Sequence, residues 1–370
     1  MRYVGWKLEN VEQTGSNFGT NQLHDNPFMC EIGGGTMVSD GLSMINTHVS
    51  STSFSIRKTR IGERNSLGND IHYPPDGRTG TNCLLGTKVL VPIDGPVREN
   101  VGLLGSPSFE IPRIVDRDKD MSESVDMATR QAAITAKNTH NLVTVGLYLL
   151  TNWMYVFISL LVGYLVISNY NASGVFPAFA VTVILAVFAI GYFAMVERAS
   201  LAFKKLKPSI VTIYDVEFWR HERHWKLADS PIVTILGGTP FKNVVSRMIG
   251  VKVGRKVYDG GSTITERTLT EIGDFACINE ACVLQPHSLE EGVFKSDVIQ
   301  IGKGCSIGPA AFVHYGVSLG DYSILDADSF LMKGERLDPC TRWRGNPAKL
   351  HRAMKVHDVR RHQAAAAAAT

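Results

Sequence analysis

The chain has 370 residues, of which 44% are hydrophobic and 20% charged, and 38 Lys and Arg against 35 Asp and Glu give a formal net charge of +3. This apolar content excludes a disordered chain, and the near balance of charge disfavours a dedicated nucleic-acid binder, which would be strongly basic. The six cysteines form no CxxC pair, so we expect neither a disulfide scaffold nor a metal site, and nucleic acid is not expected as a partner.

Residues 1–112 contain an imperfect repeat of apolar side chains at every sixth position, which can be followed from Ile61 onward. Six is a poor match to the helical period, but it is even, so an extended chain with tight turns keeps the same face inward from one short strand to the next. We expect glycine at the turns to permit the bend. The pattern predicts a solenoid of short strands. The apolar positions are Ile61, Leu67, Leu85, Val91, Val97 and Leu103, with Tyr73 and Thr79 as polar interruptions.

Residues 113–140 are charged and are expected to form a helical linker into an apolar hairpin within 141–197. No Asp, Glu, Lys or Arg occurs from residue 138 to 196. Two apolar runs there, Leu142–Ile167 and Val175–Val196, each exceed the roughly 20 residues that cross a bilayer as a helix. We therefore predict two transmembrane helices. The alternative, a buried hairpin of a soluble protein, is disfavoured by the length of the charge-free stretch.

Cations flank this hairpin on both sides and are absent from its loop. By the positive-inside rule, both flanks and both soluble parts are expected in the cytoplasm, in a multi-pass membrane protein. Residues 198–248 are expected to form a helical connector. Its aromatic and basic stretch, 218–226, suits an interfacial helix with tryptophan at the lipid headgroups better than a nucleic-acid site. The flanking cations are Arg130, Lys137, Arg198, Lys204, Lys205 and Lys207.

The period of six is clearest in residues 249–350. A second stripe of small or medium residues runs four positions behind the apolar one, and both stripes are expected to face one continuous core. Residues 351–370 form a tail that ends in an alanine run. The apolar stripe is Ile301, Ile307, Val313, Leu319, Leu325 and Leu331, and the small stripe is Cys305, Ala311, Val317, Ser323 and Ser329.

These repeats resemble those of the left-handed β-helix, or hexapeptide-repeat, acyltransferases. Residues 344–349 (RGNPAK) are similar to the G-x-P-A-K element that closes the coil in that family, and Gly105–Ser108 lies at the corresponding place in the first half. The resemblance implies a mainly β fold. We expect two left-handed parallel β-helix acyltransferase-like domains, residues 1–112 and 249–350, linked by a transmembrane helical hairpin.

Several segments also resemble the C-terminal region of nonribosomal peptide synthetases of the ε-poly-lysine-synthetase type. In that family, adenylation and carrier domains precede membrane helix pairs and three acetyltransferase-like domains. This chain would match the second of these domains, the last helix pair and the third domain. It contains no adenylation motif, so we expect a fragment, a split gene product or a degenerate remnant, which self-associates or acts with an upstream adenylation–carrier subunit. The segments are 13–19 (QTGSNFG), 91–98 (VPIDGPVR), 104–113 (LGSPSFEIPR), 238–243 (GTPFKN), 312–316 (FVHYG) and 331–335 (LMKGE).

His287 is the first candidate catalytic residue. It precedes an irregular stretch, after which the repeat resumes at Ile301, and in similar sugar acetyltransferases a histidine in that context is the general base. An unperturbed imidazole pKa of about 6.5 suits proton removal at neutral pH. His48 has a similar place before Ile61 and is the second candidate. For both, a solvated loop histidine is the alternative.

Three further residues, Asn279, Glu290 and His314, are candidates for substrate binding, and Glu291 is considered together with Glu290. Asn279 corresponds to an asparagine that helps to hold the acceptor in similar enzymes, and a turn or ladder asparagine is the alternative. Glu290 and Glu291 could orient the His287 imidazole or bind a cationic amine, with a solvated loop as the alternative. His314 lies at a corner of the repeat, where we expect it to face outward, and donor binding stays open for it.

The resemblance implies acyl or aminoacyl transfer that forms an amide bond. The donor would be a thioester, carried by phosphopantetheine on a separate carrier domain or by coenzyme A. The acceptor would be the amine of an amino acid, with His287 as its base, and a lipid membrane would be a partner. Backbone N–H groups would stabilise the oxyanion. The alternatives are a coenzyme-A-dependent O- or N-acetyltransferase and a non-catalytic scaffold.

Overall fold

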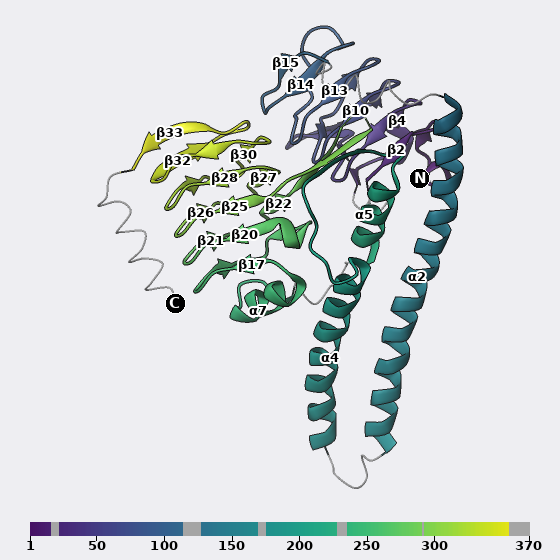
Figure 1. The fold of residues 1–370 in the computed structure, drawn as a ribbon. Coiled ribbons are helices and arrows are strands. Elements are labelled where there is room, and N and C mark those ends of the chain that lie inside the picture. Colours follow the sequence, from purple (N-terminus) through teal and green to yellow (C-terminus); the bar gives the residue numbers. More distant parts are fainter. Residues whose placement is uncertain (16–21, 114–126, 169–174, 228–234, 291, 355–370) are drawn as a thin grey trace. The chain divides into compact units, whose positions relative to one another are not determined.

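The structure is a computed structural model that describes residues 1–15, 22–113, 127–168, 175–227, 235–290 and 292–354 (Figure 1). The chain divides into two compact units. The first unit is Met1–Val125 with Leu289–Val293, and the second is Asp126–Ser288 with Phe294–Thr370. The predicted mainly β architecture of short parallel strands is confirmed in both.

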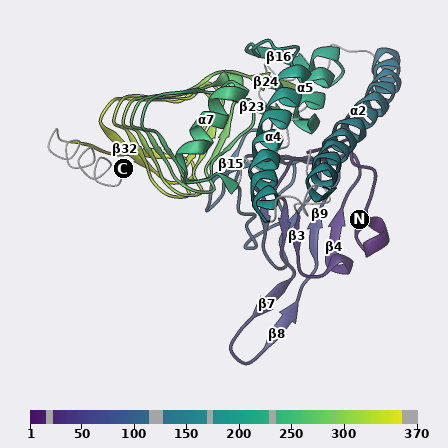
Figure 2. The same ribbon diagram turned by 90° about the horizontal axis from the view of Figure 1, so that it is seen from below.

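In the second unit the chain visits three sheets in turn, whose strands are parallel except for the antiparallel last strand β33, so that it winds as a three-sided coil. The sheets have the orders β17-β20-β25-β28-β31, β18-β21-β26-β29-β32-β33 and β19-β22-β27-β30. Figure 2 shows the coils stacked on one another. The strands are β17 (Lys252–Val253), β18 (Tyr258–Asp259), β19 (Thr263–Ile264), β20 (Thr270–Ile272), β21 (Cys277–Ile278), β22 (Val283–Gln285), β25 (Ile299–Ile301), β26 (Ser306–Ile307), β27 (Phe312–His314), β28 (Ser318–Leu319), β29 (Ile324–Leu325), β30 (Phe330–Leu331), β31 (Arg336–Leu337), β32 (Thr341–Arg344) and β33 (Lys349–Ala353).

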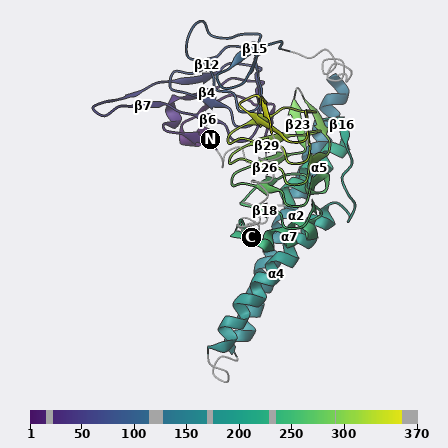
Figure 3. The same cartoon turned by 90° about the vertical axis from the view of Figure 1, so that its left-hand side faces the viewer.

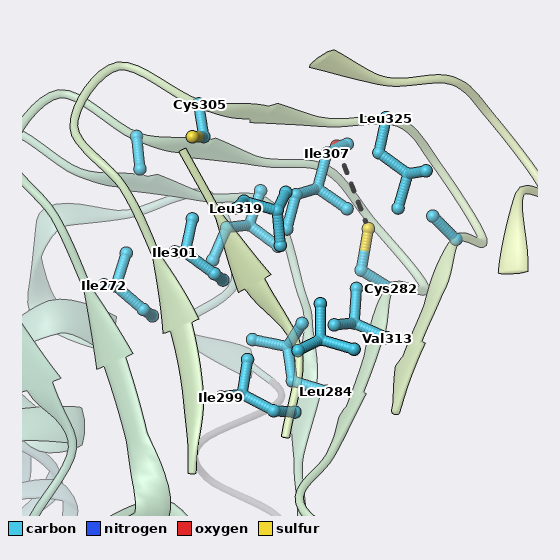
Figure 4. Packing of buried hydrophobic residues seen from close by; sticks show 14 of the residues in the cluster. Ile272, Cys282, Leu284, Ile299, Ile301, Cys305, Ile307, Val313, Leu319 and Leu325 are labelled. Atoms are coloured by element: carbon cyan, nitrogen blue, oxygen red, sulfur yellow. Dashed lines mark hydrogen bonds between the residues drawn. The ribbon is translucent and has the colours of Figure 1, made fainter. Parts of the chain in front are cut away.

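Both predicted stripes of the second unit form its core (Figure 4). Ile301 pairs with Leu319 and Ile307 pairs with Leu325 across neighbouring coils, so like residues stack along each sheet. The small stripe is buried beside them, and Cys305 is 1% exposed. All six cysteines are free thiols. The apolar stripe is therefore continuous along the coil, as the even period predicts.

The glycines that follow the apolar positions have a different role from the one expected. The left-handed backbone conformation occurs two positions further on, at Gly304 (φ 65°), Ala310 (φ 55°) and Tyr322 (φ 61°), two of which are not glycine. At Gly302 a Cβ atom would lie 2.7 Å from the carbonyl oxygen of Leu319 in the next coil. Glycine is needed there because the stacked coils approach closely, and not because the chain bends.

The first unit repeats this order of strands. Its sheets are β1-β4-β9-β12, β15-β14-β13-β10-β5-β2 and β11-β6-β3, with an added hairpin of β7 and β8. From β3 onward its main strands have counterparts at a constant spacing in the second unit, as β4 has β20 and β9 has β25, whereas β1 and β2 are five residues further from β17 and β18. The strands are β1 (Lys7–Leu8), β2 (Gln13–Thr14), β3 (Leu23–His24), β4 (Cys30–Ile32), β5 (Met37–Val38), β6 (Ser43–Met44), β7 (Thr47–Val49), β8 (Phe54–Ile56), β9 (Thr59–Ile61), β10 (Ser66–Leu67), β11 (His72–Tyr73), β12 (Arg78–Thr79), β13 (Leu84–Leu85), β14 (Gly102–Leu104) and β15 (Phe109–Ile111).

Tyr73 and Thr79, which interrupt the apolar repeat of the first unit, both lie in its core. Tyr73 is fully buried and Thr79 is 2% exposed. Their hydroxyl groups lie 2.8 Å apart and hydrogen-bond to each other, so two polar side chains are accommodated as a pair. Val97, by contrast, is 49% exposed, so its predicted core position is wrong. It lies in the irregular stretch between β13 and β14 and not on a main strand.

Two long helices belong to the second unit. α2 (Met127–Ser168) and α4 (Phe176–Ser200) contain the two predicted apolar runs. By length and composition, Ala132–Ser168 and Phe179–Ser200 could each cross a membrane. They pack together through Tyr155 and Phe188, whose rings stack 6.0 Å apart. α2 already begins within the predicted linker, of which residues 114–126 lie outside the described part of the chain.

Shorter elements connect these helices to the coil. They are β16 (Ser209–Thr212), α5 (Val216–Leu227), α7 (Pro240–Ile249) and, after β22, the strands β23 (His287–Glu290) and β24 (Val293–Ser296). Figure 3 shows α7 beside α4. α5 contains the predicted aromatic and basic stretch, but its tryptophans do not face outward. Trp219 is 6% exposed and its indole donates to the Ile213 carbonyl, and Trp225 packs on Phe294. The expected position of these rings among lipid headgroups is therefore wrong.

Candidate functional site

The coil places Glu266 beside His287. β19 and β22 are parallel neighbours, with Thr263 opposite Val283 and Ile264 opposite Leu284. The residues that follow the two strands therefore meet at the same corner of adjacent coils. Glu266 directly precedes the short 3₁₀ helix at this corner, and His287 begins β23.

The carboxylate of Glu266 holds one nitrogen of the His287 ring. Nδ1 of His287 lies 2.8 Å from a Glu266 oxygen. Among the described residues, every hydrogen bond to this imidazole goes through Nδ1. If Nδ1 carries the proton and donates it to the carboxylate, the lone pair of Nε2 is free to accept a proton. This is the arrangement that a histidine general base needs.

Three other donors reach the Glu266 carboxylate, which is fully buried. The Thr265 hydroxyl donates at 2.6 Å, the Trp225 indole N–H at 2.7 Å, and Nε2 of His221 lies 3.1 Å away. Burial alone would raise the pKa of Glu266. The charge of His287 and the hydrogen bonds from His221 and His287 outweigh burial and hold the pKa of Glu266 well below its usual range. Glu266 is therefore an anion at neutral pH.

Aromatic rings enclose the His287 imidazole. The Trp225 ring lies 4.6 Å from it and the Phe294 ring 5.7 Å, measured between centroids. The His287 side chain is 14% exposed. Packing on two rings and a hydrogen bond to a buried carboxylate together fix the orientation of the imidazole.

α5 links this site to the long helices. On one side it carries His221 and Trp225, which bind Glu266. On another side its Arg223 donates to the Thr144 hydroxyl of α2 at 3.0 Å. Burial, and then the charge of His221, lowers the pKa of His224 to about 3, so His224 is neutral where it bonds Ser200 of α4.

An ion pair between Arg267 of the coil and Glu197 also connects the end of α4 to the site. Nη1 of Arg267, the residue after Glu266, lies 2.5 Å from the Glu197 carboxylate of α4. The Glu197 side chain is 4% exposed and the Arg267 side chain 17%. A buried pair of this kind is costly to break because one charge would be left unpaired. The site is therefore held from α2, α4 and α5 as well as by the coil.

The first unit has no equivalent of this pair at the matching positions. β3 and β6 pair Leu23 with Ser43, as β19 and β22 pair Thr263 with Val283. Counting from those pairs, Asn26 takes the place of Glu266 and Thr47 takes the place of His287. The Thr47 hydroxyl donates to Asp25 at 2.6 Å.

His48 is therefore one residue out of register with His287. It is exposed on β7, opposite Ser55 of β8. Within the described residues, no side-chain hydrogen bond or ion pair joins it to a carboxylate. The prediction that His48 occupies the place of His287 is wrong, because strand pairing and not local sequence sets the register.

The three candidate binding residues are not gathered around His287. Asn279 donates its amide to the Ile307 carbonyl of the next coil at 2.7 Å, which is the ladder role weighed as its alternative. His314 is 5% exposed and packs beside Phe330, so its expected outward position is wrong. Glu290 lies on β23, three residues from His287 and hence on the opposite face of the strand.

The imidazole is oriented by Glu266 and not by either glutamate considered from the sequence. Glu291 lies outside the described residues. Glu266, Thr265, His221 and Trp225 were all missed. Of these four residues, only Glu266 could have been found from the sequence. It precedes His287 by about one coil length, so both residues lie at the same corner of the repeat.

A shallow groove of about 520 Å³ lies along the β17-β20-β25-β28 sheet. Its lining includes Gly254, Gly273 and Gly302, together with Lys252 and Gln300. These glycines follow the strands of this sheet, whereas Glu266 and His287 precede them. The groove thus lies at the carboxyl ends of these strands, whereas Glu266 and His287 lie at their amino ends. In the part of the chain that the structure describes, no group of three or more His, Cys, Asp or Glu side chains could hold a metal ion.

The chain is similar to a delta-poly-L-ornithine synthetase of Acinetobacter baumannii (strain AB307-0294). The two are 23% identical over 335 residues, which cover 87% of this chain and 24% of the synthetase. The predicted resemblance to a synthetase of poly-amino acids is confirmed. This chain spans about a quarter of the length of that relative. No family model matches the chain.

Several solved structures are similar to parts of the chain. One is a hexapeptide-repeat acetyltransferase of Vibrio cholerae with acetyl coenzyme A, at 17% identity over 33% of this chain and 84% of its own, with a TM-score of 0.28. A second is an N-acyltransferase of Bacillus cereus with dTDP and coenzyme A, at 15% identity over 32% and 81%, TM-score 0.28. A third is a maltose O-acetyltransferase of Clostridium difficile 630, at 13% identity over 43% and 97%, TM-score 0.32.

Proposed function

We propose that the chain is an acyltransferase whose second unit forms an amide bond from a thioester donor, with His287 as general base. The observation that carries this proposal is the contact of 2.8 Å between Nδ1 of His287 and the buried Glu266 carboxylate, which leaves Nε2 available. A buried anion beside Nδ1 also stabilises the imidazolium that forms when Nε2 takes a proton.

The proposed step is an exchange of a C–S bond for a C–N bond. The amine nitrogen of the acceptor attacks the thioester carbonyl while Nε2 of His287 removes an amine proton. The tetrahedral intermediate then expels the thiolate, and the imidazolium returns the proton to the departing sulfur. Glu266 remains an anion throughout. The products are an amide and a thiol, and the step needs no further reactant.

The proposed setting is a membrane-bound nonribosomal peptide synthetase. The donor is a thioester on a carrier-domain phosphopantetheine arm or on coenzyme A, and the acceptor is an amino acid. Similarity to a delta-poly-L-ornithine synthetase over 87% of the chain supports this setting. An upstream adenylation–carrier subunit, or self-association, would complete the synthetase.

We further propose two left-handed β-helix domains joined by a transmembrane hairpin. The three parallel sheets of each unit support the first part, and the two apolar helices support the second. Both units would be cytoplasmic because cations such as Lys137, Lys204 and Lys205 flank the helices. Only the second unit would provide the base, since Thr47 and Asn26 replace the pair in the first.

The test is an assay of the detergent-solubilised full chain with amine acceptors. One arm supplies aminoacyl thioesters on a carrier domain and the other supplies acetyl coenzyme A. We expect turnover with the carrier thioester that is lost in His287→Ala and kept in His48→Ala. Turnover with acetyl coenzyme A alone would identify an ordinary acetyltransferase instead. Absence of turnover in both arms, from folded protein, would favour a scaffold.

A further inference from the structure

α7 carries an exposed apolar stripe that neither the coil nor the candidate site uses. Phe241 is 64% exposed, Val244 51% and Met248 49%. These positions recur at intervals of three and four, so they lie on one face of the helix. Three large apolar side chains aligned on one exposed face are more than the isolated surface residues that soluble proteins normally show.

The opposite face of α7 is fixed to the first coil of the second unit. Nζ of Lys242 lies 2.8 Å from the Asp259 carboxylate, and each of these side chains is 3% exposed. The Asn243 amide donates to the Val257 carbonyl at 2.6 Å. Because these buried polar contacts set the rotation of the helix about its axis, its apolar stripe has to face away from the coil.

α7 also lies against α4, one of the two helices long and apolar enough to cross a membrane. A Cβ atom on Gly250, which ends α7, would lie 3.0 Å from the Arg198 guanidinium near the end of α4. The end of α7 is therefore at the level where α4 would leave the bilayer. Figure 1 shows α7 at this end of α4.

Cations accompany the stripe. Arg247 is exposed on α7, and Lys204, Lys205 and Lys207 are exposed just after α4. A helix with one apolar face and nearby Lys and Arg is suited to a membrane surface that contains anionic lipids, in which the apolar face is buried and the cations meet headgroups.

We propose that α7 is the interfacial helix of this protein, and that Phe241, Val244 and Met248 insert into the surface of an anionic lipid bilayer. The inference rests on the proposed membrane location of α2 and α4. It assigns to α7 the role that the sequence suggested for the stretch 218–226. Membrane contact through α7 holds the first coil of the second unit at the bilayer surface.

The test uses a fluorescent label on the full chain in vesicles that contain anionic lipids. A Val244→Cys variant carries bimane, in a background where the half-buried Cys277 and Cys340 are serine. A matched control carries the label at Leu350→Cys, which is 56% exposed on the last strand of the coil. Val244 and Leu350 thus differ little in exposure. Val244 lies on α7, which packs on the first coil, and Leu350 lies on the last strand.

We expect brominated lipids to quench bimane at position 244 at least about twofold more than at position 350. Equal quenching at the two positions, from protein that resists alkaline carbonate extraction, would overturn the role of α7 alone. Release of the chain by carbonate would overturn the membrane-spanning helices and the α7 proposal together. A chain that resists carbonate and shows strong quenching only at position 244 supports both.

Discussion

The Glu266 carboxylate and Nδ1 of His287 come from adjacent coils and lie 2.8 Å apart. Neither residue would meet the other in a helix or in a single strand. The contact exists because parallel coils bring equivalent corners together. A buried carboxylate is costly unless its lone pairs accept hydrogen bonds. The four donors around Glu266 supply these bonds and fix the position of the carboxylate.

Removal of the His287 imidazole should abolish most of the transfer activity. For His287→Ala we expect initial rates to fall by about 10²- to 10⁴-fold, the usual contribution of a general base. His48→Ala is the matched control, because His48 is exposed on β7 and, among the described residues, no hydrogen bond or ion pair joins its side chain to a carboxylate. Comparable losses in the two variants would argue against a base in the second unit.

Glu266→Gln should impair catalysis without impairing substrate binding. The amide keeps the volume of the carboxylate but has no charge to stabilise an imidazolium. We expect kcat to fall by about 10- to 100-fold, as for other groups that orient a histidine, with KM unchanged. Steady-state kinetics of the folded variant measure this. A rise in KM at constant kcat would show that Glu266 acts on binding instead.

Trp225→Phe tests the contribution of α5. The variant keeps an aromatic ring beside His287 but loses the indole donor to Glu266. We expect a smaller fall in kcat than for Glu266→Gln, of about tenfold or less. Trp219→Phe is the control, because its indole donates to a backbone carbonyl in the same helix region and not to Glu266. Equal effects of both variants on kcat would indicate general damage to α5.

The core and the interruption of the repeat at His287 could be predicted from the sequence because both depend on local order. The stripe of Ile301, Ile307 and Leu319 follows from an even period, and His287 is marked by the interruption of that period. The prediction that Val97 lies in the core is wrong because periodicity cannot show where the chain leaves the coil.

The surroundings of His287 could not be predicted in the same way. His221 and Trp225 reach the Glu266 carboxylate from α5, which is far away in the chain. The register of His48 depends on the pairing of β3 with β6, which the local sequence does not show. Such contacts are set by tertiary packing and leave no periodic signal.

Glu31 of the first unit should make folding stability depend on pH. Burial would raise its pKa, but hydrogen bonds from Lys58 and Lys7, with the charge of Arg60, lower the pKa of Glu31 to about 2. A depressed carboxyl pKa stabilises the fold above the unfolded value, near 4.3, and this stabilisation is lost as pH falls toward 2.

The variant that tests this is Glu31→Gln. We expect it to be less stable than the wild type by about 1–2 kcal/mol at pH 7, after allowance for screening of the exposed lysines. The difference in Tm should shrink as the pH is lowered from 5 to 3. A difference that stays constant over this range would mean that Glu31 acts through packing and not through charge.

Close approach of the coils predicts opposite outcomes for two glycines. At Gly302 a Cβ atom would lie 2.7 Å from the Leu319 carbonyl oxygen, although the backbone is not left-handed there. At Gly334 the φ angle is 75°, but nothing lies within 4 Å of the added atom. Gly302→Ala should therefore destabilise the second unit by about 1–3 kcal/mol, as overpacking does. Gly334→Asn should be nearly neutral, since asparagine tolerates the left-handed conformation. Thermal unfolding of both variants checks this order, and a Gly302→Ala variant as stable as Gly334→Asn would show that the close approach of the coils does not require glycine.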